Sequence, residues 1–187
     1  MDAGTLALTT SFPPGPLLDP APTQTPAPPR VSAVQLKSRA DEAYALHPGS
    51  CSHSVWHVIK LYLPEQTWMN ANALIDHLQQ DRRWREVDVS TAGELARKGD
   101  LVVGGKKEAT NGHVIVVYPG PDQAAGGYTY SRGGQTQNLR QRGSYPPAMS
   151  TSLGSWPGAM SRGDKTVWDP WANDARFAEV RFWHLQL

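Results

Sequence analysis

The only cysteine of the chain, Cys51, stands where a helix is expected to begin, and it is therefore the first candidate for chemistry. It lies in "PGSCSHSVWHVIKLYLP", residues 48–64, which passes from turn-forming Pro and Gly into a helical pattern. Backbone N–H groups at a helix start have no partner within the helix, and together with the helix dipole they favour a thiolate over a thiol. Cys51 is therefore a candidate nucleophile.

A catalytic cysteine needs a base within hydrogen-bond reach, and His113 has the most suitable context among the six histidines. It stands in "TNGHVIVVYPG", where Gly112 permits a close turn and the histidine opens an apolar run typical of a buried strand. A polar residue in that position is usually hydrogen-bonded or has a functional role. His47, His77 and His184 have no comparable context.

Helical phase separates Cys51 from the two histidines nearest to it in the sequence. At about 100° per residue, Val55 and Val58 fall on the side of Cys51, which must be the core face. His53 and His57 fall on the opposite side, so we expect them to point to solvent. Their i, i+4 spacing suits zinc, but further ligands and an HExxH glutamate are missing, so no metal and no cofactor is expected.

Each of these residues also has a structural interpretation. A lone cysteine in an apolar helix is usually a small core residue, and a single histidine on a strand is usually structural. The combination of Cys51 at a helix start with His113 at a strand start is what favours catalysis. Seven tryptophans would permit a carbohydrate platform, but we expect Trp56 and Trp68 to border the helical core, which leaves Trp156 in a loop.

The elements that position these residues are helices first and strands afterwards. Periodicity and capping signals predict four helices: residues 32–46, residues 50 or 51 to near 64, residues 68–81 with Thr67 as N-cap, and a helix in "STAGELARKGD" with a capping box at Thr91 and Glu94. Strands are expected at "DLVVGG", "GHVIVVYPG", "GYTYS" and "AEVRFWHLQL". Residues 132–166 are rich in Gly, Ser and Pro and predict a long loop. This order predicts an α+β domain with helices packed on an antiparallel sheet.

Composition limits the organisation and the partners. Residues 1–31 hold half of the 16 prolines and predict a flexible leader, followed by one folded domain over residues 32–187. The formal net charge is +1 and the basic residues are scattered, so no nucleic-acid partner is expected. The N-terminus has no basic start before its short apolar stretch, and no apolar run approaches a membrane span, so neither a signal peptide nor a membrane segment is expected.

The strings named above resemble those of the papain-like cell-wall cysteine peptidases, the NlpC and CHAP superfamily. Within it the sequence is most similar to the type VI secretion amidase effectors of the first class. The shared elements are a Cys-Ser pair opening a helix, then "NANALIDHL", "GDLVVGG" and "GHVIVV". The resemblance is strongest over residues 49–118. One departure is His53, where relatives commonly have glycine.

The resemblance implies a papain-like fold and a site in which Cys51 is the nucleophile and His113 the base. A third polar residue that orients the histidine would fall in "YTYS", where Tyr130 and Ser131 are the options. The segment 132–166 would flank the groove. Contacts with the stem peptide or the sugar would then come from three aromatic residues, Tyr128, Tyr145 and Trp156.

The function implied by the resemblance is hydrolysis of an amide bond in the peptidoglycan stem peptide, between γ-D-glutamate and meso-diaminopimelate. Such effectors are antibacterial toxins that type VI secretion machinery delivers, without a signal peptide, to the periplasm of a target cell, and a cognate immunity protein neutralises them. Two alternatives remain open. One is a thiol acyltransferase that uses the same residues, and the other is a non-catalytic cell-wall-binding module in which Cys51 is buried.

Overall fold

The computed structural model describes residue 1, residues 30–154 and residues 156–187. The predicted leader over residues 1–31 thus lies almost wholly outside the described residues. At the centre of the described part is a six-stranded antiparallel sheet in the order β1-β10-β2-β3-β8-β9. Its strands are β1 (Trp84–Val87), β2 (Val102–Lys106), β3 (His113–Val117), β8 (Pro147–Ser150), β9 (Ser161–Thr166) and β10 (Arg181–Leu185).

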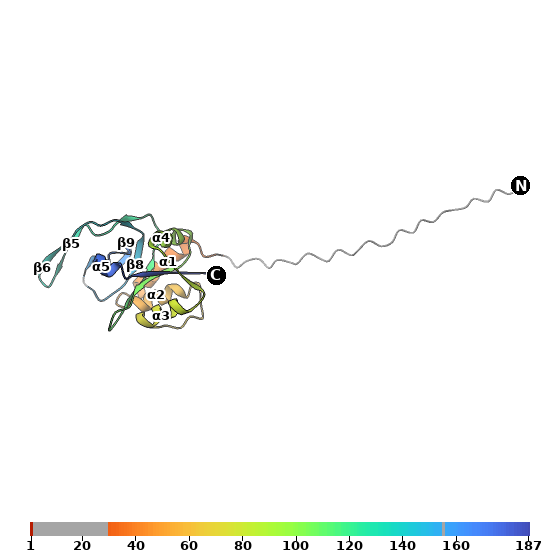
Figure 1. The fold of residues 1–187 in the computed structure, drawn as a ribbon, viewed down its shortest axis with the longest axis horizontal. Helices are drawn as coiled ribbons and strands as arrows, with labels where there is room; N and C mark the ends of the chain where they lie inside the picture. The colour runs from red at the N-terminus through yellow and green to blue at the C-terminus, as the bar shows by residue number, and fades with distance from the viewer. Residues whose placement is uncertain (2–29, 155) are drawn as a thin grey trace.

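Two small antiparallel ribbons accompany the main sheet. One pairs β4 (Gln123–Ala124) with β7 (Ser144–Tyr145), and the other pairs β5 (Tyr128–Arg132) with β6 (Gln135–Leu139). The β5-β6 ribbon extends away from the main sheet (Figure 1). The helices are α1 (Ala33–Leu46), α2 (Cys51–Ile59), α3 (Ala71–Gln80), α4 (Val89–Lys98), the short α5 (Asp174–Phe177) and the 3-10 turn η1 (Pro157–Ala159). The predicted α+β class is confirmed.

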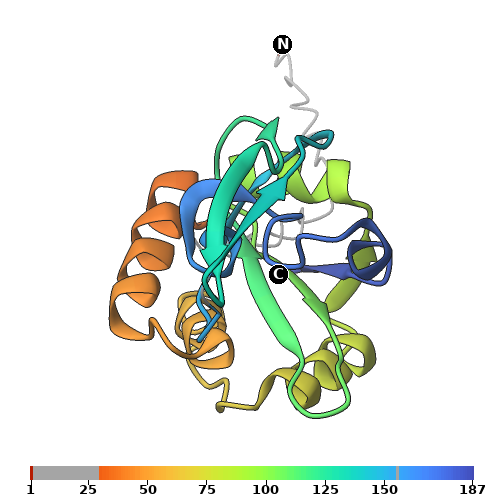
Figure 2. The same cartoon turned by 90° about the vertical axis from the view of Figure 1, so that its left-hand side faces the viewer.

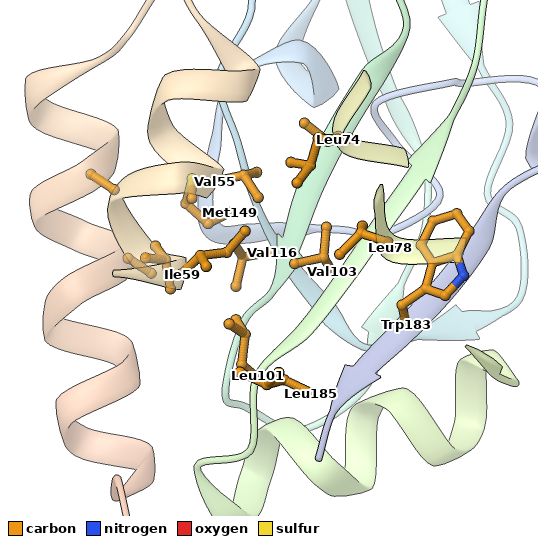
Figure 3. Packing of buried hydrophobic residues seen from close by; sticks show 14 of the residues in the cluster. Val55, Ile59, Leu74, Leu78, Leu101, Val103, Val116, Met149, Trp183 and Leu185 are labelled. Atoms are coloured by element: carbon orange, nitrogen blue, oxygen red, sulfur yellow. The ribbon is translucent and has the colours of Figure 1, made fainter. Parts of the chain in front are cut away.

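Alternation along the strands divides the buried side chains between two faces of the sheet. On one face, α1, α2 and α3 cover Val103, Val114 and Val116. Figure 2 shows α1 and α2 side by side, and Figure 3 shows residues of α2 and α3 converging on the sheet. The labelled members of this packing include Val55, Ile59, Leu74, Leu78, Val103, Val116 and Met149. On the other face, Val102, Ile115 and Val117 pack with α4, with Phe182 of β10 and with Trp171 from the connection between β9 and α5.

The helix boundaries differ in detail from the sequence prediction. The first helix is confirmed, with Ser32 as its N-cap in a complete capping box. The second ends at Ile59, before Pro64, because the chain turns there. The third begins at Ala71 with Asn70 as N-cap, so the cap expected at Thr67 is wrong.

The fourth helix also begins earlier than predicted. Its N-cap is Asp88, whose carboxylate accepts from the Thr91 amide at 2.8 Å, so the capping box expected at Thr91 and Glu94 is wrong. The predicted end at Gly99 is confirmed, because this residue adopts φ 92°, a left-handed conformation that glycine allows without strain.

The long loop expected over residues 132–166 is wrong. This segment contains all of β6, β7, β8 and β9, and the last two belong to the main sheet. The prediction failed because β8 is buried at every position and β9 is mostly polar, so neither has the alternation of a half-buried strand. This correction matters for the site, because β8 lies beside β3.

Candidate active site

Cys51 is the first residue of α2, as the sequence predicts, and it packs half-buried against the main core. Ser50 is the N-cap, but its hydroxyl does not cap the helix because it lies 2.7 Å from Nδ1 of His53. The backbone N–H groups of the first turn therefore remain available to a group beside them. Cys51 is placed to use them.

The thiol of Cys51 lies against the start of β3, where its two backbone partners are the residues before and after His113. Its Sγ is 4.0 Å from the carbonyl oxygen of Gly112, and the amide of Val114 is placed to bond the thiolate form. Because Gly112 and Val114 flank His113 in the chain, Sγ lies alongside the backbone of His113. No direct hydrogen bond between Sγ and the imidazole occurs within the described residues.

Burial sets the protonation state of the cysteine. It raises the pKa of the Cys51 thiol above its ordinary value of 9.0, and this effect exceeds the opposing influence of the amides of Val114, Ser52 and Cys51. The expectation that the helix start would favour the thiolate over the thiol is therefore wrong for the free protein, because burial outweighs the amides. In the free protein the proton stays on the sulfur at neutral pH.

His113 opens β3 as predicted, and its side chain is held from β8. Its Nε2 lies 3.1 Å from Oγ of Ser150, which is fully buried. The Ser150 hydroxyl in turn donates to the carbonyl oxygen of Ala159 at 3.1 Å. A hydroxyl has one proton, so Oγ must accept from Nε2–H of His113. This assigns the Nε2–H tautomer and leaves the lone pair on Nδ1.

The surroundings of His113 keep the imidazole neutral. Burial, together with the positive charge of Arg176, lowers the pKa of His113 to about 4. The ring of Trp171 meets it edge-on, with the centroids 5.5 Å apart. At neutral pH the site therefore holds a thiol and a neutral imidazole, which can act as a general base.

A second pair of hydroxyls joins the helix of the nucleophile to the strand that holds the base. Ser54 of α2 donates to the carbonyl oxygen of Cys51 at 2.9 Å and lies 2.7 Å from Oγ1 of Thr151. Thr151 follows Ser150 directly, and both are fully buried. The positions of Cys51 and His113 thus depend on one segment, Ser150–Thr151.

Asn72 of α3 fixes the loop that leads into His113. Its Nδ2 donates to the carbonyl oxygen of Glu108 at 2.8 Å, and its Oδ1 accepts from the Glu108 amide at 3.3 Å. A Cβ on Gly112 would overlap Oδ1 of Asn72 and would lie 2.8 Å from the carbonyl oxygen of Lys106. The close approach requires glycine at position 112.

The structure does not bring the two predicted third residues to the histidine. Tyr130 and Ser131 lie in β5, where they pair with Gln137 and Thr136 of β6. The hydroxyl beside His113 belongs to Ser150 instead. The expectation in "YTYS" assumed that the strand after β3 in sequence would also be its neighbour in space, whereas β3 pairs with β8.

The aromatic residues expected at the groove are tied to the body of the domain. The hydroxyl of Tyr128 donates to Oδ1 of Asp169 at 3.1 Å, and Trp156 donates through Nε1 to the carbonyl oxygen of Asp169 at 3.1 Å. Tyr145 packs its ring against Phe177. Their contacts give these three aromatic residues structural roles.

The predicted outward orientation of His53 and His57 is only partly correct, because both are half-buried. Nε2 of His57 lies 3.1 Å from Nη1 of Arg39 and 3.4 Å from Oε2 of Glu42, both on α1. The described residues contain no group of three or more His, Cys, Asp or Glu side chains that could hold a metal ion.

Comparison with known proteins adds no family assignment. The chain matches no protein-family model, and no curated protein matches it. Among the helices of the described ranges, none combines the length and apolar character needed to cross a membrane. What the fold and site define is an α+β protein with a cysteine at a helix start and a serine-held histidine at a strand start.

Proposed function

We propose that this protein is a cysteine amidase that hydrolyses an amide bond of the peptidoglycan stem peptide. The observation that carries the proposal is the position of Cys51 Sγ, 4.0 Å from the carbonyl oxygen of Gly112, next in the chain to a histidine whose Nε2 is held by Ser150. A buried structural cysteine would not need a base with a fixed tautomer at its side. A helix-start cysteine, a strand-start histidine and a polar residue on the neighbouring strand also support a papain-like arrangement of the NlpC and CHAP type.

The reaction begins from the neutral pair. As Sγ of Cys51 attacks the scissile carbonyl carbon, the thiol proton passes to Nδ1 of His113. Backbone N–H groups at the start of α2 stabilise the oxyanion. The C–N bond breaks, the amine leaves with the proton from His113, and a thioester remains. Water then attacks this thioester while His113 takes its proton, which releases the carboxylate and restores the thiol.

The proposed bond lies between γ-D-glutamate and meso-diaminopimelate, on the strength of the sequence resemblance. The same resemblance supports an antibacterial effector that type VI secretion machinery delivers to the periplasm of a target cell, with a cognate immunity protein as its inhibitor.

Purified full-length protein incubated with sacculi tests this proposal, with the released fragments identified by mass spectrometry. We expect fragments with a new free carboxylate on glutamate and a free amine on diaminopimelate, and no release with Cys51→Ala or His113→Ala. New amide links in place of free carboxylates would identify an acyltransferase. Unchanged release by Cys51→Ala would refute the cysteine mechanism.

A cell-wall-binding module without catalysis is the second candidate, because burial raises the pKa of Cys51. It predicts that the wild-type protein sediments with sacculi and releases nothing. It also predicts that Cys51→Ala binds as the wild type does. The fragment assay above decides between the two candidates.

A further inference from the structure

Trp68 forms an exposed aromatic stack at the start of α2, contrary to the expectation that it would border the helical core. Its side chain is 45% exposed, although most large apolar side chains of the described domain are buried. Its ring lies on that of His53, with centroids 4.6 Å apart and planes 18° apart. His47 continues the stack on His53 at 5.8 Å and 29°. We call these three residues the Trp68 stack.

Hydrogen bonds hold the stack in place and connect it to the start of α2. Nε1 of Trp68 donates to Oγ of Ser52 at 3.3 Å, and Ser52 follows Cys51 directly. Nδ1 of His53 lies 2.7 Å from Oγ of Ser50, which precedes Cys51. The stack is therefore fixed by the two residues that flank the nucleophile. Because the indole N–H is already engaged, the ring face is what Trp68 offers to a ligand.

We propose that the Trp68 stack is a sugar-binding subsite that holds a pyranose ring of the peptidoglycan glycan strand while the attached stem peptide reaches Cys51. This inference rests on the proposed function for the identity of the polymer. The existence of the Trp68 stack does not depend on that function, because it follows from the contacts of Trp68, His53 and Ser52.

A pyranose ring fits the stack better than the stem peptide does. The face of an aromatic ring carries the negative part of its quadrupole, and it attracts the weakly positive C–H groups on the apolar face of a sugar. Thr67 and Asn70 lie close to Trp68 in the chain and are exposed, and the hydroxyl of Thr67 and the Nδ2 group of Asn70 can bond sugar hydroxyls, while Oδ1 of Asn70 caps α3. The stem peptide offers carboxylates and short side chains, which have no flat apolar face.

Binding is tested with the inactive Cys51→Ala protein and peptide-free glycan strands of alternating N-acetylglucosamine and N-acetylmuramic acid, by calorimetry and by indole fluorescence. We expect saturable binding, a loss of about 3- to 10-fold in affinity with Trp68→Ala, and partial retention with Trp68→Phe. Val34→Ala removes an apolar group of α1 that is even more exposed, at 76%, and serves as the control, with affinity unchanged. Circular dichroism confirms that each variant is folded.

Activity assays separate the subsite from the reaction. With Cys51 present, Trp68→Ala should lower kcat/KM by about 3- to 10-fold on glycan-attached muropeptides and leave it unchanged on free stem peptides. No binding of peptide-free glycan, or equal affinities for wild type and Trp68→Ala, overturns the subsite. An equal loss on both substrates overturns it too, because Trp68 would then act through the folding of α2. Since glycan binding is measured without catalysis, a failure of the amidase proposal would appear separately, as absent hydrolysis by the wild type.

Discussion

Oγ of Ser150 lies 3.1 Å from Nε2 of His113 and donates its own proton to the carbonyl oxygen of Ala159. One hydroxyl on β8 therefore decides which nitrogen of a histidine on β3 carries the proton. Nδ1, bonded to Cγ and thus closer to the backbone that Cys51 contacts, keeps its lone pair. The base of the proposed reaction is defined by this pairing of strands.

Replacing Ser150 by Ala should lower kcat by about 10-fold, since an unpaired buried N–H costs about 1–3 kcal/mol and the second tautomer becomes accessible. The ¹⁵N spectrum of the His113 ring should change from one tautomer to a mixture. Ser144→Ala, at an exposed serine on β7, is the control and should leave both unchanged. A Ser150→Ala variant with wild-type kcat and a single tautomer would contradict the proposed positioning role.

The pH dependence of hydrolysis should follow the lowered pKa of His113. Because the pKa of His113 is lowered to about 4, the base stays unprotonated well below pH 6.5, and the acid limb of kcat/KM should have its midpoint near pH 4. Arg176→Gln removes the positive charge and should move the midpoint upward, by less than the whole shift, because burial is the larger cause. A midpoint near 6.5 in the wild type would show that the imidazole is solvated.

The same pKa predicts a loss of stability in acid. The folded pKa lies below the unfolded one, so the unfolded chain binds the proton first as the pH falls, and the stabilisation is lost between pH 6.5 and pH 4. Between pH 7 and pH 4.5 this should amount to about 2–3 kcal/mol in the free energy of unfolding. Urea titrations of the wild type and of His113→Gln measure it, because the variant lacks this contribution. Equal pH dependence in both proteins would rule it out.

The loop before His113 should depend on Asn72. Asn72→Ala removes both hydrogen bonds to the Glu108 backbone and should destabilise the fold by about 1–2 kcal/mol while lowering kcat/KM. Gly112→Ala should be more damaging to activity, because its Cβ would meet Asn72 and the Lys106 carbonyl and displace the strand start.

The double variant sharpens this prediction. Asn72→Ala with Gly112→Ala relieves only one of the two overlaps, so it should recover part of the activity lost by Gly112→Ala alone. Thermal unfolding and kcat/KM of the four proteins form a double-mutant cycle. Additive losses would show that the two residues do not share the contact.

Local signals in the sequence were enough to find the two central residues. A turn followed by apolar residues at helical spacing placed Cys51 at a helix start, and a β-branched run after Gly112 placed His113 at a strand start, because both signals act within a few residues. The α+β class followed from the same signals. Helical phase also placed Val55 and Val58 in the core.

The tertiary structure decided which strand lies beside His113. Ser150 and Thr151 stand in a segment whose sequence predicts a loop. They reach the site only because β8 pairs directly with β3, although the strands of both small ribbons lie between them in the sequence. Strand order is set by long-range packing, which no local pattern encodes, so the sequence pattern favours Tyr130 and Ser131 over Ser150. The protonation states of Cys51 and His113 likewise depend on burial, which exists only once the helices close over the sheet.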